Sequence, residues 1–215
     1  NRKDNLAWKA ALLLAKKYGH KPNVQIRIRK KIFSAAGLAG GSADAAAVLR
    51  GLNRLWQLAL SAEELEVLAA EMGSDVPFCI RGGTAAATGR GEILEPLFDM
   101  PETWLVLAKP NVSVSTAWAY QNFKNENVSA RPDIITMKKA ISKADKQSIM
   151  ACMGNVLESV TAKAYAEIEA IKETMMANGA QISLMSGSGP TVFCFVDSEV
   201  SGEHIAAVLR KQFAI

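Results

Sequence analysis

The chain has 215 residues, 49% of them hydrophobic, and a formal net charge of +4. This length and composition suffice for one large or two small domains with apolar cores, and they exclude a disordered chain. No uninterrupted apolar run reaches the length of a membrane span, and the three cysteines are widely spaced without a CxxC pair. We therefore expect a cytoplasmic protein with reduced cysteines and no membrane partner.

The chain opens with a predicted helix and a predicted strand. Apolar residues recur at helical spacing from Asn5 to Lys17, and Gly19 and Pro22 end the helix. From Asn23 to Ile32, isoleucine and valine alternate with charged residues, the period of a half-buried strand.

Positive charge is concentrated in this opening segment. Residues 1–31 carry ten Lys or Arg and a single acid. A basic arm for nucleic acid would have a similar charge, but stacking aromatics do not alternate with these bases. We expect a solvated strand face in which one or two bases lean over a phosphate, and no nucleic-acid partner.

The most informative stretch is AAGLAGGSADAAA, residues 35–47, which changes from a glycine-rich loop to an alanine-rich helix. Gly37, Gly40 and Gly41 allow positive φ and close approach to a ligand, and Ser42 is the predicted N-cap. Free N–H groups at a helix start suit a di- or triphosphate. An ordinary loop before a helix remains the alternative.

A second informative segment begins at Gly73, which ends a helix that the Ser61 and Glu64 capping box starts. Asp75 then lies in a loop before a strand that Pro77 is expected to begin. A carboxylate there can face a cleft as a general base, or simply cap a turn.

Later segments predict strands and helices in an order typical of an α+β sandwich with one sheet face covered. We expect an interdomain link over 93–103, a buried strand at 104–108, a short helix through Tyr120, a helix begun by Pro132 and Asp133, a long helical region over 150–178 with a break near Gly154, strands at 181–185 and 191–196 around the turn Ser186–Pro190, and a last helix over 203–213. The Ser186–Pro190 turn is a second glycine-rich loop. Two such loops with an aspartate loop between them favour a nucleotide and substrate cleft. Neither GxxxxGK[ST] nor a Rossmann GxGxxG on a strand-to-helix turn occurs.

The run from Lys31 to Ala47 resembles the central phosphate-binding motif of the GHMP kinases. Further segments narrow the resemblance to the branch that acts on a CDP-linked methylerythritol in the non-mevalonate isoprenoid pathway: GLNRLW at 51–56, GSDVPF at 73–78, ATGRGE at 87–92, VST at 114–116 and MSGSGPTVF at 185–193. The resemblance implies an α+β, two-domain GHMP kinase fold. Residues 1–98 would form an incomplete ribosomal protein S5 domain 2-like ATP-binding domain, and residues 99–215 a ferredoxin-like sandwich.

The resemblance also implies transfer of the ATP γ-phosphate to the 2-hydroxyl of 4-CDP-2-C-methyl-D-erythritol, with Mg²⁺ near Ser42 and Asp75 as the catalytic base. The loop implied to bind ATP comprises Lys30, Phe33, Ser34, Ala35, Ala36, Gly37, Leu38, Ala39, Gly40, Gly41, Ser42 and Ala43. The residues implied to bind substrate are Asp75, Thr116, Tyr120, Gly187, Ser188 and Gly189. We expect a monomer or weak homodimer.

The sequence departs from the family pattern in three ways. Phe33 stands where the family usually has proline, and Ala43 where a second serine is common. The family's opening strands, which carry a catalytic lysine, have no counterpart in these residues, so we expect weak or no activity from this chain alone. Another GHMP kinase of homoserine or mevalonate type is the alternative, and a basic nucleic-acid-binding module is disfavoured.

Overall fold

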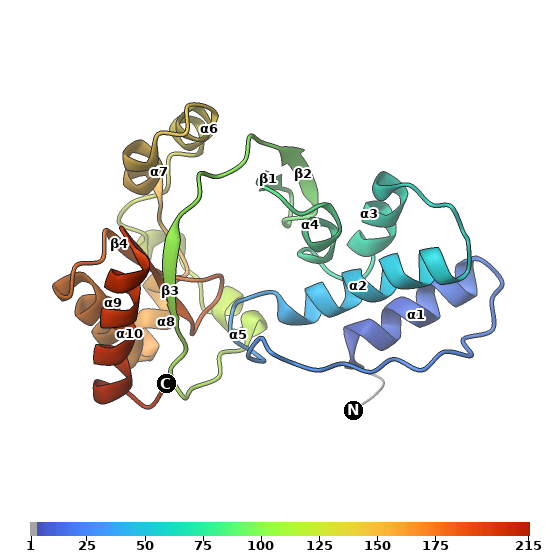
Figure 1. Ribbon diagram of the computed structural model, residues 1–215, viewed down its shortest axis with the longest axis horizontal. Coiled ribbons are helices and arrows are strands. Elements are labelled where there is room, and N and C mark those ends of the chain that lie inside the picture. Colours follow the sequence, from blue (N-terminus) through green and yellow to red (C-terminus); the bar gives the residue numbers. More distant parts are fainter. Residues whose placement is uncertain (1–3) are drawn as a thin grey trace. The chain divides into compact units, whose positions relative to one another are not determined.

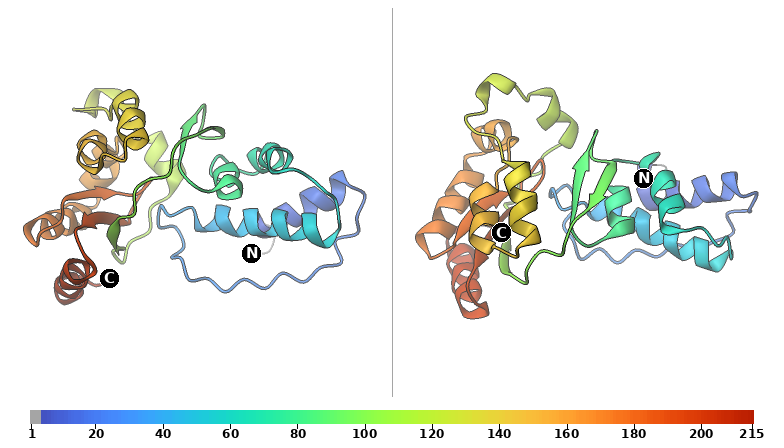
Figure 2. Two further views of the ribbon diagram at one scale, coloured as in Figure 1. Left: turned by 45° about the horizontal axis from the view of Figure 1, so that its top comes forward. Right: turned by 90° about the horizontal axis from the view of Figure 1, so that it is seen from above.

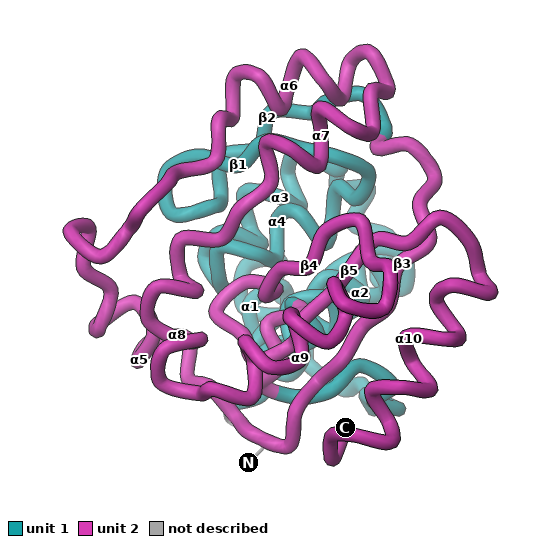
Figure 3. Tube along the Cα trace, turned by 90° about the vertical axis from the view of Figure 1, so that its left-hand side faces the viewer, with its two compact units in different colours: residues 1–34, 39–99 teal, residues 35–38, 100–215 magenta. Residues whose placement is uncertain are grey.

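The computed structural model describes residues 4–215 and divides into two compact units. Unit 1 contains the described residues up to Ser34 together with Ala39–Asp99, and unit 2 contains Ala35–Leu38 together with Met100–Ile215 (Figure 3). The short segment Ala35–Leu38 is thus part of unit 2, although both of its chain neighbours belong to unit 1.

Unit 1 consists of helices and one small hairpin. Its elements are α1 (Leu6–Lys17), α2 (Gly40–Leu55), α3 (Ala62–Ala70), α4 (Val76–Arg81), β1 (Ala85–Thr88) and β2 (Ile93–Pro96). Helices α1 and α2 pack side by side (Figure 1), and the antiparallel β1–β2 hairpin stands out in the right-hand view of Figure 2. The predicted helix over 5–17 is confirmed, with Asn5 as its N-cap.

The core of unit 1 is formed by apolar side chains that face each other across these helices. Leu14, Leu49, Leu68 and Ile80 are each at most 2% exposed. Full burial of such a side chain contributes roughly 1.5–3 kcal/mol, so these contacts hold the helices together. The predicted capping box of α3 is also confirmed, because the side chains of Ser61 and Glu64 each bind the other residue's backbone N–H.

Two predictions for unit 1 are wrong. Residues 23–32 belong to neither sheet of the described chain. A strand requires a partner for its ladder of hydrogen bonds, and this segment pairs with no strand of the described chain. Pro77 begins no strand either: it lies in the first turn of α4, where its fixed φ suits a helix and its missing N–H costs nothing. Strand β2 occupies the start of the segment predicted as an interdomain link, 93–103, and the boundary between the two units, after Asp99, lies within that segment.

Unit 2 combines one sheet with helices. Its elements are β3 (Trp104–Ala108), α5 (Thr116–Gln121), η2 (Asn125–Asn127), α6 (Ile134–Ser142), α7 (Lys146–Cys152), α8 (Glu158–Ala164), α9 (Ala166–Ala177), β4 (Ile182–Met185), β5 (Val192–Val196) and α10 (Glu199–Gln212). The sheet has the order β3-β5-β4 and both pairings are antiparallel, with Val106 opposite Cys194 and Ser183 opposite Cys194.

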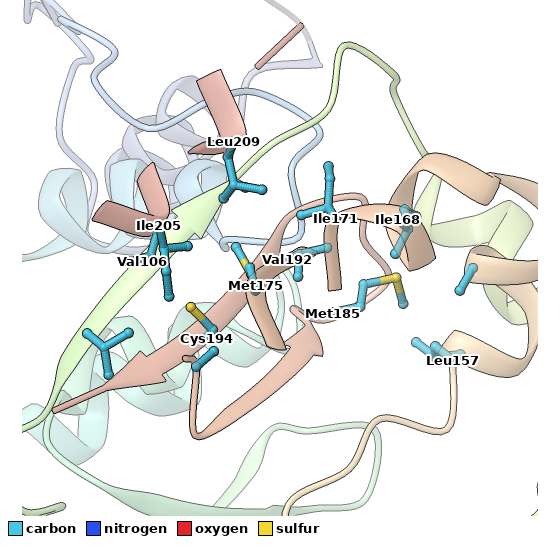
Figure 4. Close-up of a cluster of buried hydrophobic side chains, with 14 residues drawn as sticks. Val106, Leu157, Ile168, Ile171, Met175, Met185, Val192, Cys194, Ile205 and Leu209 are labelled. Atoms are coloured by element: carbon cyan, nitrogen blue, oxygen red, sulfur yellow. The ribbon is translucent and has the colours of Figure 1, made fainter. Parts of the chain in front are cut away.

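Helices α9 and α10 pack on one face of this sheet. Figure 4 shows Val106 and Cys194 from the sheet meeting Met175 of α9 and Ile205 of α10, all of them buried. The sandwich expected from the sequence is therefore present in unit 2. Strand β3 is at an edge, and its Trp104 is 52% exposed, so the expectation of a fully buried strand is wrong.

The helical region predicted over 150–178 is divided among three helices, and the predicted break near Gly154 is confirmed. Helix α7 ends at Cys152, where Met153 adopts an extended backbone, and α8 begins at Glu158. Tyr165 then separates α8 from α9 with a non-helical backbone. The interruption at 153–157 matters for the site because it carries Asn155 beside the Ser186 turn.

Candidate active site

The glycine-rich loop leads directly into α2. The helix begins at Gly40, after Ala39 in the left-handed conformation with φ 49°, and Ala39 gives no side-chain cap. The prediction that Ser42 is the N-cap is wrong, because the helix starts two residues before it. Ser42 instead contributes its N–H and hydroxyl to the first turn.

The start of α2 presents backbone donors. The first helical hydrogen bond runs from Ala43 N to Ala39 O at 2.9 Å, so the N–H groups of Gly40, Gly41 and Ser42 lie ahead of it without an intrahelical acceptor. The aligned peptide dipoles of this 16-residue helix add positive potential at the same end. Such a helix start favours an anion such as a phosphate.

Lys30 is held over this helix start. Its Nζ donates to the Gly40 carbonyl oxygen at 3.1 Å and forms an ion pair with Asp44 Oδ2 at 2.6 Å. The lysine side chain remains 37% exposed. A lysine ammonium group therefore lies beside the backbone donors of the helix start.

The preceding turn is bonded to the second glycine-rich loop. Ser186 Oγ donates to Gly37 O at 2.8 Å, and Thr191 N donates to Ala36 O at 3.3 Å. Gly37 has φ 72°, and a Cβ there would lie 2.2 Å from the carbonyl oxygen of Ser186. Only glycine fits at this position, so the close approach of the two loops depends on the missing side chain.

Two of the expected substrate residues, Thr116 and Tyr120, belong to helix α5, and Thr116 is bonded to the second glycine-rich loop. Thr116 Oγ1 and Ser188 Oγ are 3.0 Å apart and share a hydrogen bond. Tyr120 lies one helical turn beyond Thr116 on α5, so the two share a face, and it is 64% exposed. Unit 2 thus brings together Thr116, Tyr120 and the loop Gly187–Gly189.

Asp75 belongs to unit 1 and precedes α4. It is exposed and occupies the N-cap position, yet its side chain forms no cap hydrogen bond. Burial raises the pKa of the nearby Cys79 thiol, and the negative charge of Asp75 raises it by a smaller amount. A carboxylate that is not engaged as a cap is available to accept a proton.

Several polar side chains behind the second loop were not predicted. Asn155 donates to the carbonyl oxygens of Met185 and Gly187, and Thr161 donates to that of Ser188. Glu158 accepts from Met185 N at 2.6 Å. A single polar residue next to the break expected near Gly154 gives no signal of this role, because its hydrogen-bond partners lie about 30 residues away.

Within residues 4–215 there is no group of three or more His, Cys, Asp or Glu side chains placed so that they could hold a metal ion. The helices of the same residues are all too short or too polar to span a membrane.

Comparisons with known proteins cover both units. The family model for the GHMP kinases N terminal domain matches residues 5–83, and that for the GHMP kinases C terminal matches residues 137–215. The 4-diphosphocytidyl-2-C-methyl-D-erythritol kinase of Geobacillus thermodenitrificans is 52% identical over 206 residues, which are 96% of this chain and 71% of that protein.

Solved structures of kinases also match this chain. A crystal structure of 4-(cytidine 5'-diphospho)-2C-methyl-D-erythritol kinase matches with a TM-score of 0.82 and 32% identity, covering 97% of this chain and 75% of that one. The homoserine kinase from Cytophaga hutchinsonii has a TM-score of 0.81 at 18% identity, over 98% of this chain and 72% of that one. At such low identity the second likeness concerns the fold alone.

Proposed function

This chain belongs to the GHMP kinase family, and we propose that it transfers the γ-phosphoryl group of ATP to the 2-hydroxyl of 4-CDP-2-C-methyl-D-erythritol. The predicted α+β, two-domain GHMP kinase fold is confirmed, since family models match both ends of the chain and a solved relative superposes over 97% of it. The 52% identity to a kinase named for this substrate supports the choice of acceptor.

The start of α2 is the observation that carries the proposal. The N–H groups of Gly40, Gly41 and Ser42 and the ammonium group of Lys30 form a donor set that fits the β- and γ-phosphates. The turn before it, Phe33–Ala39, would wrap the same phosphates with its backbone. Phosphoryl transfer depends mainly on positioning and charge stabilisation, which such donors provide.

The Ser42 hydroxyl fits a magnesium ion that is carried mainly by the nucleotide. Mg²⁺ prefers oxygen ligands and is usually held by one or two protein groups together with phosphates and water. When bound, the ion would supply neutralisation of the phosphate charge.

Asp75 is the proposed general base. Its exposed carboxylate makes no cap hydrogen bond and can accept the proton of the attacking hydroxyl. This role is a proposal that its loop position and its match to the family's GSDVPF segment support.

The cytidine end of the substrate would bind on unit 2. The exposed ring of Tyr120 offers a face for base stacking, which contributes about 1–3 kcal/mol per base in proteins that bind nucleotides this way. Thr116, held by Ser188, would present polar atoms next to that ring, and the backbone of Gly187–Gly189 would line the same site.

We further propose a cytoplasmic location, a monomeric or weakly dimeric state and no nucleic-acid partner. The three cysteines of the described chain are all free, which supports a reducing compartment.

The test is an ATP-dependent kinase assay on the native gene product with three acceptors: CDP-methylerythritol, homoserine and mevalonate. We expect turnover with the first only. Comparable turnover of either other acceptor would move the assignment to another GHMP kinase.

A further inference from the structure

Asn155 lies beneath the second glycine-rich loop and binds it on both sides of Ser186. Its Nδ2 donates to Met185 O at 2.7 Å and to Gly187 O at 2.8 Å. Its Oδ1 accepts from Leu157 N at 3.0 Å, which anchors the side chain to the start of the next helical segment. One amide group therefore fixes two carbonyl groups that flank a single residue.

Ser186 passes this constraint to the first loop. Its N–H donates to Thr191 O at 2.8 Å and its carbonyl accepts from Gly189 N at 2.9 Å, so the backbone of the turn is closed. Its hydroxyl donates to Gly37 O at 2.8 Å. The space is tight from the other side as well, since a Cβ on Gly187 would lie 3.1 Å from Gly37 O.

Neighbouring side chains complete the support. Glu158 Oε1 accepts from Met185 N, and its Oε2 pairs with Lys172 Nζ at 2.7 Å. Thr161, fully buried, donates to Ser188 O at 3.2 Å. Asn155, Glu158 and Thr161 thus hold backbone groups of residues 185, 187 and 188 from α8 and the residues just before it.

We propose that Asn155 is a positioning residue for phosphate binding: it orients the Ser186 turn, and through the Ser186 hydroxyl it sets the position of Gly37 in the first loop. The inference rests on the proposed role of that loop in binding ATP. Asparagine suits the task because its amide supplies two donors from one nitrogen and an acceptor. A carboxylate of the same shape would face two carbonyl oxygens with a negative charge.

The decisive variant is Asn155→Asp, compared with wild type and with Asn178→Ala. Asn178 is a matched control in unit 2, because its Nδ2 also donates to a backbone carbonyl, that of Thr174, but at the end of α9. Three measurements are made: the Kd of the ATP analogue AMPPNP by calorimetry, the melting temperature, and the amide signals of glycines labelled with ¹⁵N.

We expect Asn155→Asp to weaken AMPPNP binding about tenfold or more, which corresponds to about 1.4 kcal/mol. The amide signals of Gly37 and Gly187 should shift while those of Gly19 and Gly73 stay. Asn178→Ala should change neither binding nor these signals. A folded Asn155→Asp protein with wild-type Kd and an unshifted Gly37 signal overturns the inference, even if its melting temperature falls.

Ser186→Ala serves as the second variant, because it removes one hydrogen bond and leaves the backbone intact. It should shift the Gly37 signal and weaken AMPPNP binding several-fold; an unchanged Gly37 signal overturns the inference even where Asn155→Asp does not fold. If wild type binds no AMPPNP, the proposed function fails, and the glycine signals alone decide the role of Asn155.

Discussion

The hydroxyl of Ser186 donates a 2.8 Å hydrogen bond to the carbonyl oxygen of Gly37, joining two glycine-rich turns that are 149 residues apart in the chain. Both turns belong to unit 2, although Gly37 lies between two segments of unit 1. This bond makes the conformation of the proposed phosphate loop depend on residues near the end of the chain.

The first prediction concerns Gly37→Ala. The new Cβ would meet the Ser186 carbonyl oxygen at 2.2 Å in addition to the strain of φ 72°, so we expect a loss of stability above the roughly 1–3 kcal/mol of backbone strain alone, together with weakened AMPPNP binding. Gly19→Ala is the control, since Gly19 has φ 68° and open space around it. Urea unfolding gives the free energy of unfolding of both variants. An equal loss of stability in Gly37→Ala and Gly19→Ala would contradict the predicted clash with Ser186.

A second prediction concerns Lys30→Met. The Lys30–Asp44 pair is partly exposed, so its loss should change stability by only about 0–1 kcal/mol. Binding of AMPPNP should weaken roughly 10- to 100-fold, because a charged hydrogen bond to phosphate contributes about 1.5–3 kcal/mol. Lys17→Met, which removes the exposed 3.8 Å pair with Glu71, should leave the Kd unchanged. Equal Kd values for all three proteins would remove Lys30 from the site.

A third prediction concerns Asp75→Asn. Loss of a general base should lower kcat of the native gene product about 10²- to 10⁴-fold, while the Kd of AMPPNP stays near wild type. Asp133→Asn is the control: Asp133 caps α6, and asparagine caps a helix about as well. A kcat that falls less than a few-fold would assign Asp75 to the turn alone.

The sequence predicted those elements whose signals are local. Asn5, Ser61 and Asp133 begin helices through hydrogen bonds within three residues, and each prediction is confirmed. The burial of a strand in the sheet of unit 2 cannot be predicted from neighbouring residues, because it depends on whether that strand lies at the edge of the sheet. Trp104 therefore has the apolar character of a core residue, although it is 52% exposed.

The wrong or missing predictions concern features that the neighbouring residues alone do not determine. The strand expected over 23–32 would need a partner for its hydrogen bonds, which alternation along one segment cannot reveal. Pro77 is compatible with the start of a strand and with the first turn of a helix, because neither position requires the backbone N–H that proline lacks. Asn155 acts through contacts with residues about 30 positions away, and a single sequence carries no trace of them.

A fourth prediction concerns thiol reactivity. Burial raises the pKa of the Cys194 thiol to about 11, against a smaller lowering by the hydrogen bond from the Val106 backbone. The thiolate is the reactive form, so at pH 8 only about one Cys194 in a thousand is ionised in the folded protein. We expect Cys194 to escape alkylation at pH 8 for as long as the protein is folded, and to react fully in urea. Mass mapping of the alkylated peptides measures this, and rapid labelling of folded protein at Cys194 would contradict it.

The last prediction concerns Tyr120 and the cytidine end of the substrate. If its exposed ring stacks on cytosine, Tyr120→Ala should weaken CDP binding by about 1–3 kcal/mol, or roughly 5- to 150-fold. Tyr120→Phe keeps the ring face and should bind within a few-fold of wild type, which separates stacking from a hydrogen bond of the hydroxyl. Thr116→Val removes the 3.0 Å bond to Ser188 without touching the ring, so it reports on the neighbouring polar contact. Calorimetry with CDP gives all four affinities, and AMPPNP binding measured on the same proteins should not change with Tyr120. Equal loss of CDP binding in the Phe and Ala variants would rule out stacking as the main contribution of this residue.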